Sequence, residues 1–260
     1  MASKLLEKTR RLNRVLQKKG NAPVSFGELA VLLKETLEAN VYIVDIGGDV
    51  LGSSFYVEED SAVIVNQKTG RAYLPISYSE SLNEMETSVT NLTGEKLLEA
   101  FNGEAATSHK FLTVLPIFGN SRRLGSIMLA RAEKEFTDED LILSEIAATV
   151  VGMEIIRANA QAKEIDDRQL AIVNMAIDTL SYSEQEAVHH IFRELKGNEG
   201  TLVASRIADR AGITRSVIVN ALRKFESAGV IETRSLGMKG TRIKILNNKL
   251  KHRLNKMKNG

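Results

Sequence analysis

The sequence predicts an α+β protein of two domains, with a small antiparallel sheet covered by helices at the N terminus and a winged helix-turn-helix at the C terminus. Three observations support this prediction. A chain of 260 residues is longer than one modest domain requires. Hairpin-like patterns alternate with helical patterns up to about residue 155, and basic residues are concentrated after residue 204. We expect domains at 1–155 and 181–260, joined by a long helix over 138–180 that overlaps the end of the first domain.

The N-terminal domain begins with two predicted helices. Apolar residues recur at helical spacing over residues 3–17, and charged residues fill the other positions. Ser25, followed three residues later by Glu28, predicts a capping box that opens a second helix ending near residue 38. The apolar stripe of the first helix is interpreted as core, with dimer packing as the alternative.

Strand-like runs then predict two hairpins, at 41–44 with 50–55 and at 111–118 with 124–131. The second hairpin is expected to turn at Gly119, Asn120 and Ser121. The segment between the hairpins shows little periodicity, apart from one helical patch at 95–101.

A long helix is predicted from Asp138 to Thr179. Thr137 and Asp138 offer N-caps, and the helical pattern continues without a breaker through a charged stretch. At about 1.5 Å per residue such a helix spans roughly 60 Å, which suits a connection between domains. The next helix is expected to open at Ser183, with Glu186 as its capping-box partner, and to end at 197–200.

The strongest motif is the stretch 204–223, which has the spacing of a helix-turn-helix. Two helices that cross steeply need a small side chain where their axes approach, and Ala208 meets this need. The turn needs a residue that tolerates positive φ, and Gly212 supplies it four residues later. Thr214 is the expected N-cap of the second helix. A helical hairpin used only for protein contact is the alternative.

DNA contacts are expected from this motif and from a hairpin that follows it. Arg215 and Ser216 begin the recognition helix and are expected at base edges, because arginine can pair bidentately with guanine. Asn220 is expected to read adenine or to brace the backbone, whereas Arg206, Arg223 and Lys224 are expected to hold phosphates. The complete predicted interface is Ala204, Ser205, Arg206, Ala208, Thr214, Arg215, Ser216, Val217, Asn220, Arg223, Lys224, Arg234, Lys239 and Arg242.

A β-wing is predicted from strand-like runs at 230–234 and 241–246 around a loop with two glycines. Its basic residues would bring charge to an adjacent groove or its phosphates. The tail at 249–258 is interpreted as too basic for a core helix, so we expect it to fray or to touch DNA.

The charge is divided unevenly along the chain. Residues 204–260 hold fourteen Lys and Arg against three acids, a net charge of +11, whereas the rest of the chain carries −9. Neutralising DNA phosphates releases condensed counterions, so a basic segment of this kind favours DNA association. A solvated basic tail is the alternative interpretation.

Several classes of protein are not supported. No apolar run approaches the roughly 20 residues of a membrane span, so we expect a cytoplasmic protein that binds no membrane. The absence of cysteine excludes disulfides and thiolate sites. Neither a metal site nor an enzyme is expected, because Ser205 and Ser216 have no nearby base and no metal-ligand spacing links the histidines His109, His189, His190 and His252.

The stretch 180–244 resembles the CodY family, the global nutritional repressors of low-GC Gram-positive bacteria. The similar segments include Leu180 to Glu184 (LSYSE), Ile213 to Lys224 (ITRSVIVNALRK) and Arg234 to Thr241 (RSLGMKGT). Residues 6–10, 124–125 and 136–154 are also similar, so the resemblance spans nearly the whole chain. It implies a GAF-type sensor domain and a homodimer that represses starvation genes from a DNA operator when nutrients and GTP are plentiful.

The resemblance also implies a pocket for a branched-chain amino acid, most notably isoleucine. The implied pocket residues are Leu74, Pro75, Tyr78 and Phe101. The family's arginine that pairs with the ligand carboxylate has no counterpart at 60–64, and a buried carboxylate without a cation is costly. Lys68, Arg71 or backbone donors would have to replace it. The alternative is a sensor domain that answers to another signal.

GTP is implied as a second effector, at segments corresponding to 119–125, 138–141 and 247–250. The chain has no phosphate-binding loop of the GxxxxGK[ST] type. Gly119 and Gly125 are therefore interpreted as hairpin residues.

Overall fold

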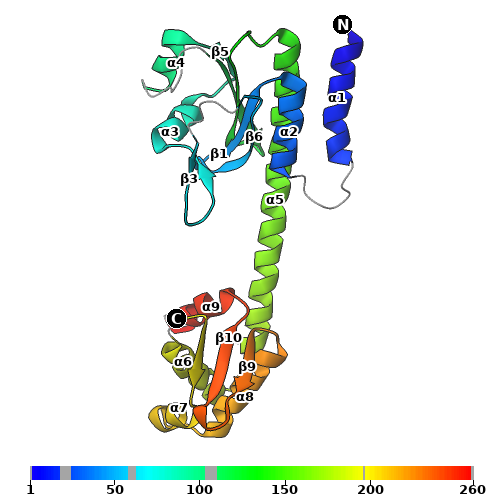
Figure 1. Ribbon diagram of the computed structural model, residues 1–260. Helices are drawn as coiled ribbons and strands as arrows, with labels where there is room; N and C mark the ends of the chain where they lie inside the picture. Colours follow the sequence, from blue (N-terminus) through cyan, green and yellow to red (C-terminus); the bar gives the residue numbers. More distant parts are fainter. Residues whose placement is uncertain (1, 18–24, 58–62, 103–109, 196, 259–260) are drawn as a thin grey trace. The chain divides into compact units, whose positions relative to one another are not determined.

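The chain folds as two compact units, Met1–Ala160 and Gln161–Gly260, and helix α5 (Asp138–Asp178) contributes to both. The structure is a computed structural model that describes residues 2–17, 25–57, 63–102, 110–195 and 197–258 (Figure 1). The α+β fold class is confirmed. The predicted uninterrupted helix is also confirmed, since α5 runs for 41 residues and ends one residue before Thr179.

Unit 1 is built on a five-stranded antiparallel sheet with the order β2-β1-β7-β6-β5. Its strands are β1 (Asn40–Asp45), β2 (Val50–Ser54), β5 (Val89–Leu92), β6 (Phe111–Gly119) and β7 (Arg122–Arg131). Both predicted hairpins are confirmed, as β1–β2 and β6–β7. The second turn is tighter than predicted, because only Asn120 and Ser121 form it. Both have positive φ, 49° and 58°, as a type I′ hairpin turn requires.

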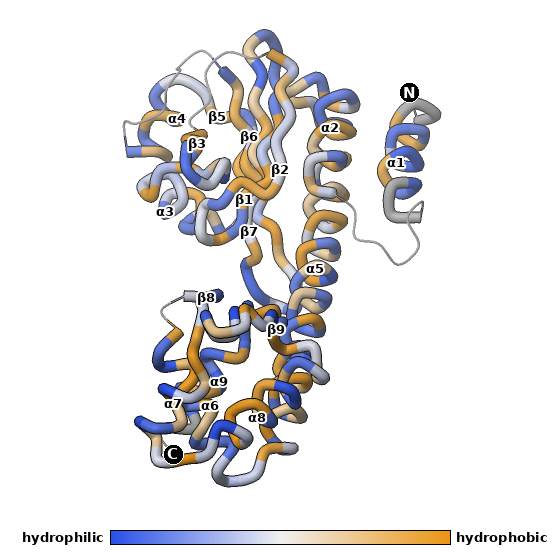
Figure 2. Tube along the Cα trace, turned by 60° about the horizontal axis from the view of Figure 1, so that its bottom comes forward, coloured by the Kyte–Doolittle hydropathy of each residue, from blue (hydrophilic) through white to orange (hydrophobic). Residues whose placement is uncertain are grey.

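One face of the sheet is covered by α2 (Phe26–Leu37) and the first half of α5, with α1 (Ala2–Gln17) beside α2 (Figure 1). Val41 and Ile43 of β1 point into this core, because alternate strand residues share a face. Leu33 of α2 and Val151 of α5 meet them there. Figure 2 shows hydrophobic residues along the central strands, as expected for a sheet buried on both faces.

The other face carries α3 (Ile76–Glu84), α4 (Gly94–Ala100) and the short hairpin of β3 (Ile64–Val65) and β4 (Ala72–Tyr73) (Figure 1). Tyr42 and Val44, which alternate with Val41 and Ile43 along β1, point into this second core. The predicted helical patch is confirmed as α4. Helix α3 and strands β3, β4 and β5 were not predicted from the sequence.

Unit 2 contains the end of α5 and a winged helix-turn-helix, which confirms the predicted C-terminal fold. Its helices are α6 (Tyr182–Glu194), α7 (Ala204–Ala211), α8 (Arg215–Ser227) and α9 (Lys249–Lys258). A three-stranded antiparallel sheet has the order β8-β10-β9, with β8 at Glu199–Leu202, β9 at Ile231–Ser235 and β10 at Thr241–Ile245. The segment 197–200, predicted only to end a helix, thus supplies the first residues of β8.

Two predicted capping boxes are corrected. The box that opens α6 is Ser181 with Glu184, two residues before the predicted pair: Ser181 Oγ accepts from the Glu184 N–H at 3.3 Å, and Glu184 Oε2 accepts from the Ser181 N–H at 2.7 Å. The sequence holds two overlapping Ser-x-x-Glu patterns, and the first one forms because Ser181 has the extended backbone of an N-cap. Ser25 occupies the N-cap of α2 but makes no side-chain capping bond.

The interpretation of the tail as too basic for a core helix is wrong. Leu250 and Leu254 of α9 are buried in the core of unit 2. Two basic residues beside them find partners in the second half of α5: Lys249 Nζ lies 2.6 Å from Asp166 Oδ2, and Arg253 Nε donates to Asn174 Oδ1 at 2.7 Å. Two apolar residues one turn apart are enough to dock this helix, because the charges stay at its rim.

Candidate DNA-binding surface and effector pocket

The turn between α7 and α8 has the geometry that the motif predicts. Gly212 ends α7 in the left-handed conformation, with φ of 68°, and its N–H donates to the Ala208 carbonyl. The next N–H, of Ile213, donates to the same carbonyl at 3.1 Å. Thr214 takes the N-cap position of α8, but its hydroxyl bonds to that of Ser216, at 2.8 Å, and not to the helix backbone.

Helix α8 has one buried face and one exposed face. The buried face packs on α7 and α6 through Ile218, Ala221, Leu222 and Phe225. Ala208 of α7 is buried in the same core, so it supports the surface without reaching it. The predicted interface residues that are exposed on the two helices are Ser205, Arg206, Thr214, Arg215, Ser216, Asn220 and Arg223, whereas Ala204 and Val217 are half-buried. The structure thus brings a polar and basic face to the start of α8.

The ammonium of Lys224, one of the predicted phosphate contacts, is engaged within unit 2. Lys224 Nζ lies 2.6 Å from Glu184 Oε2 and donates to the Thr179 carbonyl at 2.8 Å. Burial raises the pKa of Glu184, but the hydrogen bonds from Lys224 and Ser181 outweigh it, and the pKa lies below its ordinary value. Lys224 therefore ties the recognition helix to the start of α6 and to the segment after α5.

The wing is the β9–β10 hairpin and its loop. Arg234 and Arg242 are direct partners across the two strands, and Arg242 Nη2 lies 3.2 Å from Glu199 of β8. Lys239 is exposed in the loop. The loop also exposes Leu236 and, completely, Met238, neither of which was predicted as a contact. The sequence pattern that could have indicated this exposure is an apolar residue, Met238, in a loop between Gly237 and Gly240.

The four implied effector residues come together between α3, α4 and the sheet. Leu74, Tyr78 and Phe101 are buried in one cluster, and Pro75 is half-buried at the N-cap of α3. The rings of Tyr78 and Phe101 are stacked, with centroids 4.9 Å apart. The three side chains thus form part of the apolar core on this face of the sheet.

A cation for the ligand's carboxylate is not found among these residues. Of the segment 60–64, where the resemblance implies an arginine, residues 60–62 lie outside the described residues, and Val63 and Ile64 occupy the other two positions. Lys68 and Arg71 are exposed on the β3–β4 hairpin.

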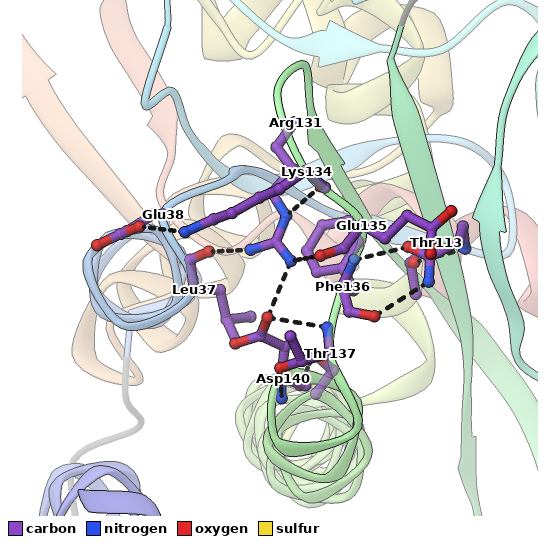
Figure 3. Close-up of polar contacts among 11 residues, drawn as sticks. Leu37, Glu38, Thr113, Arg131, Lys134, Glu135, Phe136, Thr137 and Asp140 are labelled. Carbon is purple, nitrogen blue, oxygen red and sulfur yellow. Dashed lines mark hydrogen bonds and ion pairs between the residues drawn. The ribbon is translucent and has the colours of Figure 1, made fainter.

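A buried arginine connects the sheet of unit 1 to the start of α5 (Figure 3). Arg131, the last residue of β7, donates to the carbonyls of Leu37 at 3.1 Å and Lys134 at 2.8 Å, and also to that of Glu135. Its Nη2 lies 2.9 Å from Asp140 Oδ2, and its guanidinium lies 4.0 Å from the centroid of the Phe136 ring. One side chain thus fixes the end of α2, the loop before α5 and the first turn of α5.

Asn91 of β5 holds the same loop from the other side. Its side chain accepts from the Phe136 N–H at 2.8 Å and donates to the Phe136 carbonyl at 3.0 Å. Its own N–H donates to Thr113 of β6 at 3.1 Å. Since β5 leads directly into α4, whose C-cap is Phe101, the network links a wall of the candidate pocket to α5.

Gly119 and Gly125 are hairpin residues of β6 and β7, as interpreted from the sequence. Among the described residues, no group of three His, Asp or Glu side chains is placed to hold a metal ion. In the same part of the chain, no helix combines the length and the apolar character needed to cross a membrane.

Comparison with known proteins gives a family match for each unit. Residues 4–179 match the CodY GAF-like domain family, and residues 198–258 match the CodY helix-turn-helix domain family. A global transcriptional regulator CodY of Caldanaerobacter subterraneus subsp. tengcongensis is 53% identical over 254 residues, covering 98% of each chain. That of Clostridium botulinum strain Hall is 53% identical over 259 residues, covering 98% of this chain and all of the relative. The cofactor-binding GAF domain of the nutrient sensor CodY from Clostridium difficile is 41% identical, covers 60% of this chain and 99% of its own, and gives a TM-score of 0.48.

Proposed function

The chain belongs to the CodY family of global transcriptional regulators, and on that premise we propose that it acts mainly as a repressor that binds a two-fold symmetric DNA operator as a homodimer. A branched-chain amino acid, with isoleucine first, is the proposed effector of its GAF domain, and GTP a second one. We place it in the cytoplasm, where its DNA lies, and assign it no catalytic role. The proposed division keeps 1–155 as sensor, 138–180 as connecting helix and 181–260 as DNA-binding domain.

The exposed face at the start of α8 carries this proposal. Arg215 and Ser216 stand in the first turn of α8, fully on its exposed side, while the opposite side is locked into the core. A recognition helix meets base edges with its N-terminal residues, so we assign Arg215 to a guanine. Asn220, one turn later on the exposed side, is assigned to adenine or to the backbone.

Phosphate contacts are assigned to the exposed basic residues around this face. Arg206, Arg223 and Lys239 are exposed, and the segment that holds them carries a net charge of +11. Arg234 and Arg242 add charge on the wing. For Lys224, the ion pair with Glu184 favours a positioning role over the phosphate contact expected from the sequence.

The effector proposal is supported by the stacked pair of Tyr78 and Phe101, which shares one buried apolar cluster with Leu74. An isoleucine side chain would lie against these apolar walls, and its carboxylate would need Lys68, Arg71 or backbone N–H groups. The missing arginine in 60–64 favours a second candidate, a DNA-binding regulator whose sensor domain binds a different ligand.

Two titrations of the full chain test these proposals. Fluorescence anisotropy on an operator selected in vitro from random duplexes should give an affinity that falls steeply with salt and exceeds that for random duplex. Absence of any salt-sensitive affinity would reject the DNA-binding assignment. Calorimetry with isoleucine, and with leucine and valine in parallel, should give saturable heat. Undetectable heat at millimolar ligand selects the second candidate.

A further inference from the structure

The tip of the wing displays an apolar side chain to solvent. Met238 is fully exposed, and Leu236 beside it is 38% exposed. An exposed methionine gains nothing from burial in the protein itself, so its place at the tip of a basic hairpin is informative. The strands behind the tip carry Arg234 and Arg242, and Lys239 follows Met238 directly.

The wing loop holds this side chain in a defined position. The Leu236 N–H donates to the Gly240 carbonyl at 2.8 Å, and the Gly240 N–H donates to the Gly237 carbonyl at 3.1 Å, so residues 237–239 form one 3₁₀ turn. Gly237 and Gly240 have φ of 61° and 103°, values that glycine adopts without strain. A turn closed by its own backbone bonds projects Met238 from a stiff base.

The base of the loop is also fixed to the helix-turn-helix. A Cβ at Gly240 would lie 2.4 Å from the Leu202 carbonyl oxygen, so the backbone of the wing lies against the end of β8. Leu202 pairs with Thr241, and α7 begins two residues after Leu202. The wing tip is therefore positioned relative to the same helices that carry the proposed DNA contacts.

The chemistry of this tip fits the DNA minor groove. When α8 lies in a major groove, a wing beside it meets the neighbouring minor groove, which is only about 6 Å wide. A narrow minor groove attracts basic side chains, and apolar side chains including methionine enter between base steps from that side. Methionine is unbranched and flexible, so it fits a narrow groove where a β-branched residue would not.

We propose that Met238 is a minor-groove contact residue, which enters the groove beside the recognition helix and makes affinity depend on the groove's floor and width. This inference rests on the proposed binding of α8 to DNA. It adds a second source of specificity, at base pairs that α8 does not touch. Lys239 supplies attraction to the phosphates, whereas Met238 supplies the discrimination.

Base analogues that change only the minor groove test this role. Inosine in place of guanine removes the amino group from the groove floor, and 2,6-diaminopurine in place of adenine adds one, while the major-groove face keeps its hydrogen-bonding groups. The analogues are placed in the selected operator next to the α8 site, and affinities of the full chain are measured at one salt concentration. The variants are Met238→Ala and, as control, Met175→Ala, an exposed methionine of α5 in the same unit.

The wild-type chain is expected to lose about fivefold to tenfold in affinity when diaminopurine is present and to tolerate inosine. Met238→Ala should bind the unmodified operator about fivefold more weakly and respond little to either analogue, whereas Met175→Ala should behave as wild type. Wild-type affinity and analogue response in Met238→Ala would overturn the inference and leave the α8 assignment standing. Absence of specific DNA binding by the wild-type chain would reject both the Met238 inference and the α8 assignment.

Discussion

Arg131 and Asp140 meet at the start of α5, where Arg131 Nη2 lies 2.9 Å from Asp140 Oδ2 and the two side chains are 6% and 13% exposed. The pair joins the last residue of the central strand β7 to the first turn of the helix whose far end, at Val173 and Ile177, lies in the core of unit 2. The pair therefore fixes the end of β7 to the first turn of α5.

Arg131→Ala is expected to destabilise unit 1 strongly. Breaking a buried pair leaves Asp140 without its cation and three carbonyls without their donor, which costs about 3–5 kcal/mol. Urea unfolding followed by tyrosine fluorescence measures the loss. Arg11→Ala is the matched control, because Arg11 pairs with Glu35 on the surface, at 2.5 Å, and should cost under about 1 kcal/mol. Similar losses in the two variants would contradict a buried junction.

Acid should weaken the same junction. Burial raises the pKa of Asp140, but hydrogen bonds from Arg131 and Thr137 outweigh it, so the pKa in the folded protein lies below the ordinary value. A carboxylate with a depressed pKa contributes stability above its unfolded pKa and loses that contribution as pH falls through the folded value. Between about pH 5 and pH 3 the wild type should lose more stability than Asp140→Asn. Parallel pH profiles for the two proteins would argue against the shift.

Two glycines should differ sharply in their tolerance of alanine. A Cβ at Gly125 would lie 2.0 Å from the Val44 carbonyl oxygen, inside the β1–β7 pairing, so Gly125→Ala should cost about 3 kcal/mol or more. A Cβ at Gly212 would meet no atom within 4 Å, so alanine there is strained only by the positive φ. Gly212→Ala should therefore cost about 1–2 kcal/mol. Thermal melting of the two variants checks the order, and a reversed order would contradict this account of the β1–β7 approach.

Lys224 and Lys239 should separate stability from phosphate binding. Lys224→Ala removes the partner of Glu184 and should lower the unfolding midpoint of unit 2 while leaving the slope of log affinity against log salt unchanged. Lys239→Ala should keep the midpoint and reduce that slope by about one. A reduced slope of log affinity against log salt for Lys224→Ala would show that Lys224 contacts a phosphate.

The helix-turn-helix could be predicted residue by residue because its geometry imposes residue types. The small Ala208, the left-handed Gly212 and the start of α8 each follow from sterics that act within a few residues. The long helix α5 could be predicted equally well, because a continuous helical pattern does not depend on residues distant in the sequence.

The missed elements depend on contacts far along the chain. Helix α3 presents only Tyr78 and Leu82 as large inward residues, too few to establish a period. Strand β5 is interrupted at Asn91, whose φ of 53° breaks the alternation and which bonds to Phe136. Strand β8 buries one side chain, Leu202, and exists because β10 pairs with it.

The candidate sites divide in the same way. The DNA-binding face could be predicted from the motif and the charge together, whereas the stacked Tyr78 and Phe101 were expected only through a family resemblance. No local sequence pattern around Tyr78 or Phe101 indicates that the two side chains are in contact. The wing-tip Met238 was missed because exposure of an apolar residue becomes evident only when the loop around it is built.

The central claim is that α8 reads bases in the major groove through Arg215. Its most direct test compares Arg215→Ala on the selected operator and on random duplex of equal length, by anisotropy at one salt concentration. Loss of about 1–3 kcal/mol on the operator, with little change on random duplex, is the predicted result. Equal losses on both duplexes would show that Arg215 holds only phosphate and would contradict the claim.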